Sequence, residues 1–178
     1  GSVKTPILWM KACPMNEKPH IRIELRSNPP YLAGVRQLIA SVAQRLGMSE
    51  MTCSQIALAV DEALCNVICH GYCREPDNPI WVSIWPVHNK NPNQTGIRIV
   101  IEDEADQVEL CQLKSRSLDD PRPGGLGIHI IREVMDTVTY EKRSPRGMRV
   151  TMEKFTAPPT NAPPTNTPTH RPAPKANG

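Results

Sequence analysis

Aromatic side chains are scarce in this sequence: three Trp, three Tyr and one Phe account for 4% of its 178 residues. A basic surplus is also nearly absent. The formal net charge is +3, but residues 156–178 hold two of the 21 basic residues and none of the 18 acidic ones, which leaves 19 against 18, or +1, for the rest. Because nucleic-acid-binding domains combine a basic stripe with aromatic stacking platforms, these two absences argue against direct nucleic-acid binding.

Long apolar runs and paired cysteines are missing as well. No apolar run approaches the roughly 20 residues that span a bilayer. The N-terminus, GSVK, does not begin a secretory signal, and its Gly-Ser start is typical of the remnant of a cleaved tag. The six cysteines form no CxxC pair, which argues against a structural zinc site. Reduced thiols are the simpler interpretation, so we expect a cytoplasmic protein without a membrane anchor.

Proline, in contrast, is abundant, and seven of the 19 prolines lie in the last 23 residues. This segment has no acidic and no large apolar side chain, so it cannot bury enough apolar surface to offset the entropy lost on ordering. We therefore predict an N-terminal extension at residues 1–19, one domain at 20–155 and a disordered tail at 156–178.

Periodicity predicts eight elements in the domain, in the order β-α-α-β-β-α-β-β. Apolar and polar residues alternate in HIRIELR, as in a half-buried strand, and apolar residues recur at helical spacing in three segments. The strands are expected at 20–26, 80–87, 97–102, 137–143 and 148–155, and the helices at 31–46, 49–72 and 125–135. Consecutive strands with short connections favour a mixed or antiparallel sheet. We expect an α+β fold, a two-layer sandwich whose sheet is covered on one face by helices.

Three details of this pattern are specific enough to test. The strand IRIVIE at 97–102 is almost continuously apolar, which predicts a central position in the sheet. Pro86 predicts that its strand ends at a sheet edge or bulge. Ser49 is expected to be the N-cap of the second helix.

The second predicted helix carries a polar stripe made of Glu62, Asn66 and His70. Residues four apart are offset by about 40° around a helix, so the three side chains share one face. A carboxylate can deprotonate a hydroxyl nucleophile, and an amide oxygen suits Mg²⁺, which takes few protein ligands. From spacing alone, a solvated helix face without a chemical role is the simpler alternative.

A glycine cluster, PGGLGI at 123–128, opens the third predicted helix. Glycines permit close approach of the backbone to a ligand, and the N–H groups at a helix start suit phosphate. The segment is not a Walker A motif, because no Gly-Lys-Ser/Thr follows. A flexible turn before an ordinary helix is the alternative.

Asp103 ends the apolar strand IRIVIE. A carboxylate at a strand terminus beside a loop can accept a hydrogen bond from a ligand amine. The alternative is an acid that ends a strand and faces water.

Taken in order, these features resemble the GHKL (Bergerat-fold) ATPases, and within them the bacterial anti-sigma-factor serine kinases of partner-switching regulation. The segment VDEALCNVICHGY at 60–72 is similar to the family's N-box, E-A-x-x-N-x-x-x-H-x-Y, at each motif position. GGLGI at 124–128 and the helix after it resemble the second glycine box. The strand pair at 138–141 and 146–154 resembles the family's last two strands. The resemblance covers about residues 20–155.

The resemblance implies a kinase that binds ATP and Mg²⁺. Glu62 would be the general base that activates a serine hydroxyl of a protein substrate, Asn66 would ligate Mg²⁺, and Asp103 would bind the adenine amino group. Residues 104–124 would form a lid over the nucleotide. Further nucleotide contacts are expected from His70, Gly124, Gly125, Leu126 and Gly127.

The resemblance also implies partners. The kinase would phosphorylate a serine or threonine of a small STAS-type anti-sigma-factor antagonist and would bind a sigma factor when that antagonist is phosphorylated. A homodimer is left open. The catalytic half of a sensor histidine kinase is not favoured, because residues 1–19 leave no room for a dimerising helical hairpin with a phospho-accepting histidine.

The sequence departs from the family pattern in two places. The first glycine box, D-x-G-x-G, reads DEADQ at 103–107, with Ala105 and Gln107 in place of the glycines. Met148 follows Gly147 where the family has a threonine. These departures leave a second hypothesis open: a non-catalytic GHKL-fold binding module with a degraded nucleotide site, which would act only by protein–protein sequestration.

Overall fold

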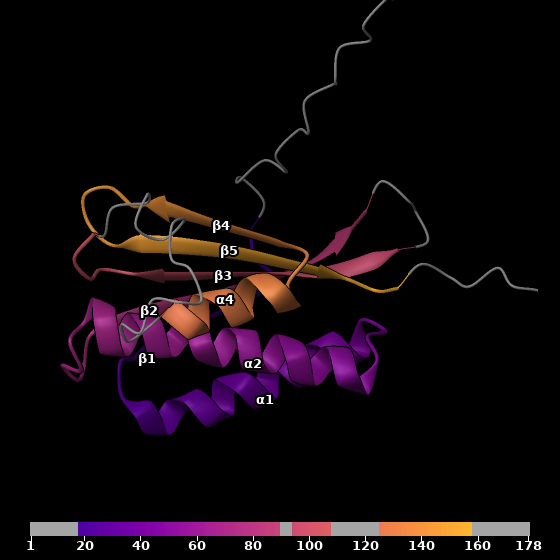
Figure 1. Ribbon diagram of the computed structural model, residues 1–178, viewed down its shortest axis with the longest axis horizontal. Coiled ribbons are helices and arrows are strands. Elements are labelled where there is room, and N and C mark those ends of the chain that lie inside the picture. Colours follow the sequence, from indigo (N-terminus) through magenta and orange to yellow (C-terminus); the bar gives the residue numbers. More distant parts are fainter. Residues whose placement is uncertain (1–17, 90–93, 108–124, 158–178) are drawn as a thin grey trace, which may run out of the picture.

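The computed structural model describes residues 18–89, 94–107 and 125–157. Within them, five strands form one sheet in the order β1-β2-β3-β5-β4, and each neighbouring pair is antiparallel. Figure 1 shows the helices on one face of this sheet. The predicted α+β two-layer sandwich is therefore confirmed, in its antiparallel form. The strands are β1 (Ile21–Arg26), β2 (Pro79–His88), β3 (Thr95–Asp103), β4 (Thr137–Lys142) and β5 (Met148–Phe155).

The helices of the described ranges are α1 (Leu32–Arg45), α2 (Glu50–Asn66) and α4 (Gly125–Val134). A short 3₁₀ turn, Pro29–Tyr31, leads into α1. The Ser49 side chain accepts a hydrogen bond from the backbone N–H of Thr52 at 3.2 Å, which confirms the predicted N-cap of α2. At its other end α2 passes directly into a π-helical turn, Val67–Gly71.

β3 lies at the centre of the sheet, between β2 and β5, as its apolar sequence predicts. Its side chains Ile97, Ile99 and Ile101 are at most 1% exposed. The prediction for Pro86 is also confirmed. This residue lies beyond Ile84, where pairing with β1 ends, so no described strand flanks β2 on that side.

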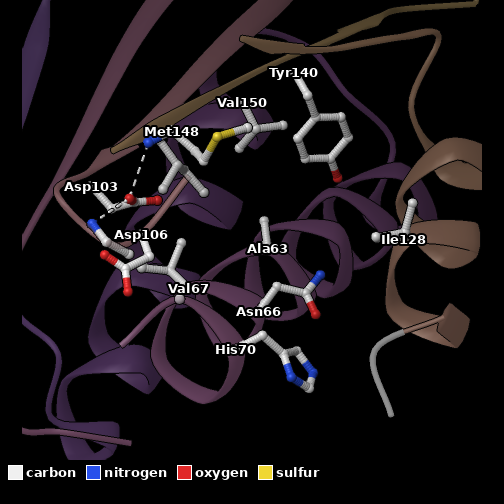
Figure 2. Close-up of a pocket in the computed structure, with 13 residues that line it drawn as sticks. Ala63, Asn66, Val67, His70, Asp103, Asp106, Ile128, Tyr140, Met148 and Val150 are labelled. Carbon is white, nitrogen blue, oxygen red and sulfur yellow. Dashed lines mark hydrogen bonds between the residues drawn. The ribbon is translucent and has the colours of Figure 1, made fainter. Parts of the chain in front are cut away.

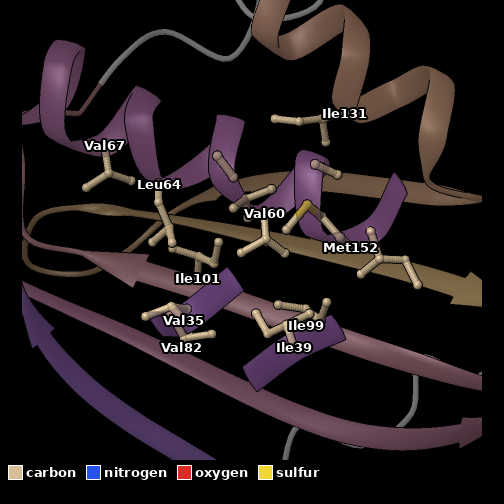
Figure 3. Close-up of a cluster of buried hydrophobic side chains, with 14 of the residues drawn as sticks. Val35, Ile39, Val60, Leu64, Val67, Val82, Ile99, Ile101, Ile131 and Met152 are labelled. Atoms are coloured by element: carbon tan, nitrogen blue, oxygen red, sulfur yellow. The ribbon is translucent and has the colours of Figure 1, made fainter. Parts of the chain in front are cut away.

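The core lies between the sheet and the helices. Figure 3 shows aliphatic side chains from α1, α2 and α4 meeting those of β3 and β5, each at most 1% exposed: Ile39, Val60, Leu64, Ile131, Ile99, Ile101 and Met152. Full burial of such a side chain stabilises the fold by about 1.5–3 kcal/mol. This packing fixes α2 against the sheet, and it thereby fixes the direction of the polar stripe on α2.

One helix in the described ranges, Glu50–Gly71, is long and apolar enough to cross a membrane by length and composition alone. It comprises α2 and the π-helical turn. Its side chains Ile56, Val60 and Leu64 are completely buried inside the domain. Core packing therefore accounts for its composition.

The predicted domain limits remain predictions. Nearly all of the N-terminal extension and the tail, and most of the lid predicted at 104–124, lie outside the described residues. The regular elements run from Ile21 to Phe155.

Candidate functional site

A pocket of about 110 Å³ opens between α2, α4 and the end of the sheet where β3 stops. Most of its lining is apolar and comes from all three parts: Ala63, Val67, Ile101, Ile128, Met148 and Val150. Three of the predicted site residues, Asn66, His70 and Asp103, also line it (Figure 2). A small apolar slot with a few polar groups at its rim is the usual form of a small-molecule site.

Glu62 and Gly127 meet beside Asn66 and are not themselves among the residues that line this pocket. A Cβ atom added to Gly127 would lie 2.6 Å from Glu62 Oε2 and 3.5 Å from the side-chain amide of Asn66. Gly127 is buried, and no larger residue fits at its position without moving the carboxylate. The glycine cluster and the polar stripe, about 60 residues apart in the sequence, therefore lie next to each other in the fold.

The polar stripe does not continue unchanged to His70. A π-helical turn closes i→i+5 hydrogen bonds rather than i→i+4, and the turn Val67–Gly71 begins just after Asn66. The i, i+4 spacing that predicts the stripe therefore ends at Asn66. His70 still lines the pocket, but its side chain is exposed.

The other predicted glycine-box residues are less informative. Gly124 lies outside the described residues, and Gly125 is the first residue of α4. Leu126 is 65% exposed and is not part of the pocket lining. Nucleotide contacts by these three residues stay predictions.

Asp103 is only 4% exposed and is held by two backbone donors. Its Oδ1 atom accepts hydrogen bonds from the N–H of Ala105 at 2.9 Å and from the N–H of Met148 at 3.1 Å. Figure 2 shows these two bonds, with the second carboxylate oxygen directed into the pocket. Burial raises the pKa of the Asp103 carboxyl, and the two backbone hydrogen bonds oppose this effect. The free oxygen is thus an acceptor for a ligand donor.

Tyr72, the last residue of the N-box pattern, fixes the chain on either side of this carboxylate. Its hydroxyl donates to the carbonyl of Pro79 at 2.7 Å and accepts from the N–H of Glu104 at 2.7 Å. The end of the helix layer is thereby tied to the start of β2 and to the end of β3. The sequence indicated Tyr72 only as a motif position, without a role.

Gln107 does not enter the pocket. Its side-chain amide donates to the carbonyl of Arg143, and to the carbonyl of Gly147 at 3.3 Å. Gly147 has φ +95° and lies so close to Asp103 that an added Cβ would be 1.9 Å from the Asp103 carbonyl oxygen. Gln107 therefore binds the turn between β4 and β5 to the segment after β3, and this turn supplies the Met148 N–H that holds Asp103.

Ala105 fits at its position because the residue that faces it is a glycine, Gly71. Ala105 is 2% exposed, and its Cβ would lie 2.9 Å from a Cβ added to Gly71. The methyl group that replaces the family's glycine thus packs against a glycine of the π-helical turn.

Arg143 braces the same corner from the outer face of the sheet. Its guanidinium lies 5.2 Å from the Trp81 ring centroid, 3.3 Å from Glu102, and donates to the carbonyl of Asp103. Burial alone raises the pKa of Glu102, but the charges and hydrogen bonds of Arg149, Arg143 and Arg22 lower it overall. This ion-pair cluster fixes the residue that precedes Asp103 in β3.

Sequence reasoning missed three contributors to the site: the Met148 N–H, the Gln107 amide and Tyr140. Met148 and Gln107 are apparent only as departures from a motif. Tyr140 lines the pocket from the edge strand β4, and the sequence indicated it only as part of a strand, without a role.

The two-layer fold, with an apolar pocket beside a buried carboxylate and a polar helix stripe, defines a GHKL-type nucleotide-binding domain. The chain belongs to the family described as the histidine kinase-like ATPase domain, whose sequence profile matches residues 25–154. The family resemblance expected from the motifs is therefore confirmed.

Curated relatives narrow this assignment. The protein named serine-protein kinase RsbW of Bacillus subtilis (strain 168) is 23% identical over 148 residues, which cover 79% of this chain and 88% of that protein. The protein of the same name from Staphylococcus aureus (strain MRSA252) is 28% identical over 143 residues, 76% of this chain and 86% of that protein. The chain is thus similar over most of its length to proteins named serine-protein kinase.

The residues of this site fit ATP and Mg²⁺, the groups that a kinase-like ATPase domain uses. The free Asp103 oxygen can accept from an adenine amino group, and the apolar slot suits a purine ring. Asn66 offers one amide oxygen, and the described residues contain no group of three or more His, Cys, Asp or Glu that could hold a metal ion. Mg²⁺ needs no such group, since it commonly binds one or two protein oxygens together with water and substrate phosphates.

Proposed function

We propose that this protein is an ATP-dependent serine/threonine protein kinase of a bacterial partner-switching system. The observation that carries the proposal is the position of Gly127 against Glu62 and Asn66, because it brings a carboxylate and an amide next to a glycine in the first turn of a helix. The similarity to proteins named serine-protein kinase supports it.

In this proposal, Asp103 and the apolar slot hold the adenine, and Asn66 holds Mg²⁺. Gly127 allows the backbone of α4 to come close to the phosphates, and the positive end of the α4 dipole favours their charge. When bound, ATP supplies the phosphoryl group and Mg²⁺ offsets the charge that develops on it.

Glu62 would accept the proton of the substrate hydroxyl, whose oxygen would take the γ-phosphoryl group of ATP while the bond to the leaving ADP breaks. Among the described residues Glu62 has no hydrogen bond or ion pair, and its side chain is only partly buried. A carboxylate without a partner is available as a base. Accurate positioning of reactants supplies a large share of the catalysis in phosphoryl transfer.

The substrate in this proposal is a STAS-type anti-sigma-factor antagonist, and the partner that is sequestered is a sigma factor. Both come from the motif resemblance, and the relatives' names support only the serine-kinase part. The protein would act in the cytoplasm, in line with the free thiols of the described cysteines Cys53, Cys65, Cys69 and Cys73.

The test is incubation of the full chain with Mg-ATP and a candidate antagonist encoded nearby, followed by intact-mass spectrometry. We expect one phosphate on the antagonist, and none with Glu62→Gln. Arg36→Gln, which removes an ion pair to Asp61 on the far side of α2, is the matched control and should stay active. If the antagonist binds but never gains a phosphate, the protein is a non-catalytic sequestration module instead.

A further inference from the structure

Tyr140 is the described residue whose buried polar atom has no partner. Its hydroxyl oxygen is inaccessible to solvent, and no hydrogen bond to it is formed within the described ranges. The residue lies on β4 and lines the pocket. Figure 2 shows the hydroxyl directed toward the side where Ile128 of α4 lies. Removing a hydroxyl from water without a new hydrogen bond is unfavourable, so the absence of a partner calls for an explanation.

The Tyr140 hydroxyl keeps its proton over the physiological pH range and so keeps its ability to form hydrogen bonds. Burial raises the pKa of Tyr140 to about 12, against a smaller opposing effect of the Arg132 charge. The group is therefore neutral at physiological pH, when it can both donate and accept a hydrogen bond.

The position of Tyr140 complements that of Asp103. Tyr140 pairs with Val150 of β5, and Val150 pairs with Ile101 of β3, two residues before Asp103. β5 lies between the two strands, so β4 and β3 are about 10 Å apart. Figure 2 shows Asp103 and Tyr140 on opposite sides of the pocket. A ligand whose amine meets Asp103 and that fills the slot would thus bring its far end to Tyr140, and it would reach the hydroxyl by displacing the side chains that cover that oxygen.

We propose that Tyr140 is a specificity-determining residue that hydrogen-bonds to the nucleoside part of the bound nucleotide, at a purine ring nitrogen or a ribose oxygen. The proposal rests on the proposed function, since it takes the pocket to be the nucleotide site. Asp103 then recognises the amine at one end of the nucleoside, and Tyr140 recognises a polar atom at the other.

A purely structural role makes a different prediction. Tyr140 packs against the apolar core, and a phenylalanine would fill the same space. If packing were its only role, loss of the hydroxyl would leave nucleotide affinity unchanged.

The experiment is calorimetric titration of Mg-ATP into the full chain, comparing the native protein with Tyr140→Phe. Tyr31→Phe is the matched control, because it removes the same hydroxyl from a side chain that is 53% exposed and away from the pocket. We expect Tyr140→Phe to weaken ATP binding by about fivefold to tenfold, and Tyr31→Phe to leave it unchanged. Without nucleotide, Tyr140→Phe should melt at the same or a higher temperature, since a buried unpaired hydroxyl is gone.

Repeating the titration with 2′-deoxy-ATP tests whether the ribose 2′-hydroxyl is the hydrogen-bond partner of Tyr140. If Tyr140→Phe no longer weakens binding when this ligand is used, the ribose 2′-hydroxyl is the partner of Tyr140. If it still weakens binding, the partner is a ring nitrogen or another ribose oxygen. Either result supports the proposal. Equal ATP affinities of the native protein and Tyr140→Phe would overturn it while leaving the proposed function intact, whereas no ATP binding by the native protein would overturn both.

Discussion

The two ends of the pocket follow the family pattern to different degrees. At the α2–α4 end, Glu62, Asn66 and Gly127 stand at their motif positions, and Gly127 lies against the other two side chains. At the β3–β5 end, two motif glycines and a motif hydroxyl are replaced, by Ala105, Gln107 and Met148. Yet the carboxylate at this second end is still held by two hydrogen bonds, with one oxygen directed into the pocket.

The difference shows that the two ends depend on different physical requirements. The α2–α4 end depends on the absence of a side chain, because a Cβ at Gly127 would collide with Glu62. The β3–β5 end depends on donors to Asp103, and both donors are backbone N–H groups, which every residue except proline supplies. We therefore expect a replacement at the second end to be tolerated where a replacement at the first is not.

The largest effect should come from Gly127→Ala. The added methyl displaces the Glu62 carboxylate, and a displacement of about 1 Å costs on the order of 100-fold in rate, so phosphoryl transfer at saturating ATP should fall by about that factor. Stability should change little, because the displaced atom is the free end of a side chain. Gly34→Ala on α1 is the control, since nothing lies within 4 Å of its added Cβ. Equal rates for the two variants would show that Glu62 is not the base.

Asp103→Asn should have the next largest effect, on binding rather than on rate. The amide would present N–H groups to the ligand amine, and loss of a hydrogen bond to a charged group costs about 1.5–3 kcal/mol, or roughly tenfold to 150-fold in Kd. The variant should unfold at the same or a higher temperature, because burial makes the ionised carboxylate unfavourable. Asp61→Asn, in a surface ion pair with Arg36, is the matched control. A collapse of stability without a change in Kd would assign Asp103 to the fold alone.

Acidification should weaken ATP binding gradually. The pKa of Asp103 is raised, and its proton would reside on the oxygen that faces the pocket, so affinity should fall by up to about tenfold per pH unit below that pKa. The sign for stability is the opposite: the contribution of Asp103 to the free energy of unfolding is greatest below its unfolded pKa and is lost as pH rises through the folded pKa. Measuring the Kd for ATP as a function of pH tests this prediction. Asp103→Asn is the control, because protonation of the phosphates affects both proteins and protonation of Asp103 affects only the native one. Parallel pH profiles of Kd for the native protein and Asp103→Asn would contradict the prediction.

The smallest effect is expected from Gln107→Gly, which restores the family's glycine. Because Gln107 joins two carbonyls of the β4–β5 turn, its loss should lower the free energy of unfolding by about 1 kcal/mol. ATP affinity should stay the same or weaken slightly. Thermal melts and titrations, with Gln107→Ala to separate backbone entropy from hydrogen bonds, test this. Tighter binding by the glycine variant would mean that Gln107 obstructs the site.

The sequence predicted the fold well because the fold depends on local signals, and the two motifs of the α2–α4 end are local patterns too, although they meet from about 60 residues apart. Apolar periodicity located the strands and helices, and spacing placed Glu62 and Asn66 on one helix face. The β3–β5 end depends on contacts between distant residues: Gln107 reaches carbonyls 36 and 40 residues away, and Asp103 is held by Met148, 45 residues away. No local pattern encodes such pairings. The π-helical turn that changes the register before His70 has no local signature either.

The central claim is that the altered β3–β5 end still admits ATP. Calorimetric titration of the full chain with ATP, with and without Mg²⁺ and with Asn66→Ala, tests it most directly. We predict saturable one-to-one binding that Mg²⁺ strengthens in the native protein but not in Asn66→Ala. A folded protein that binds no ATP at millimolar concentration would contradict the claim and would leave a module that acts only by binding other proteins.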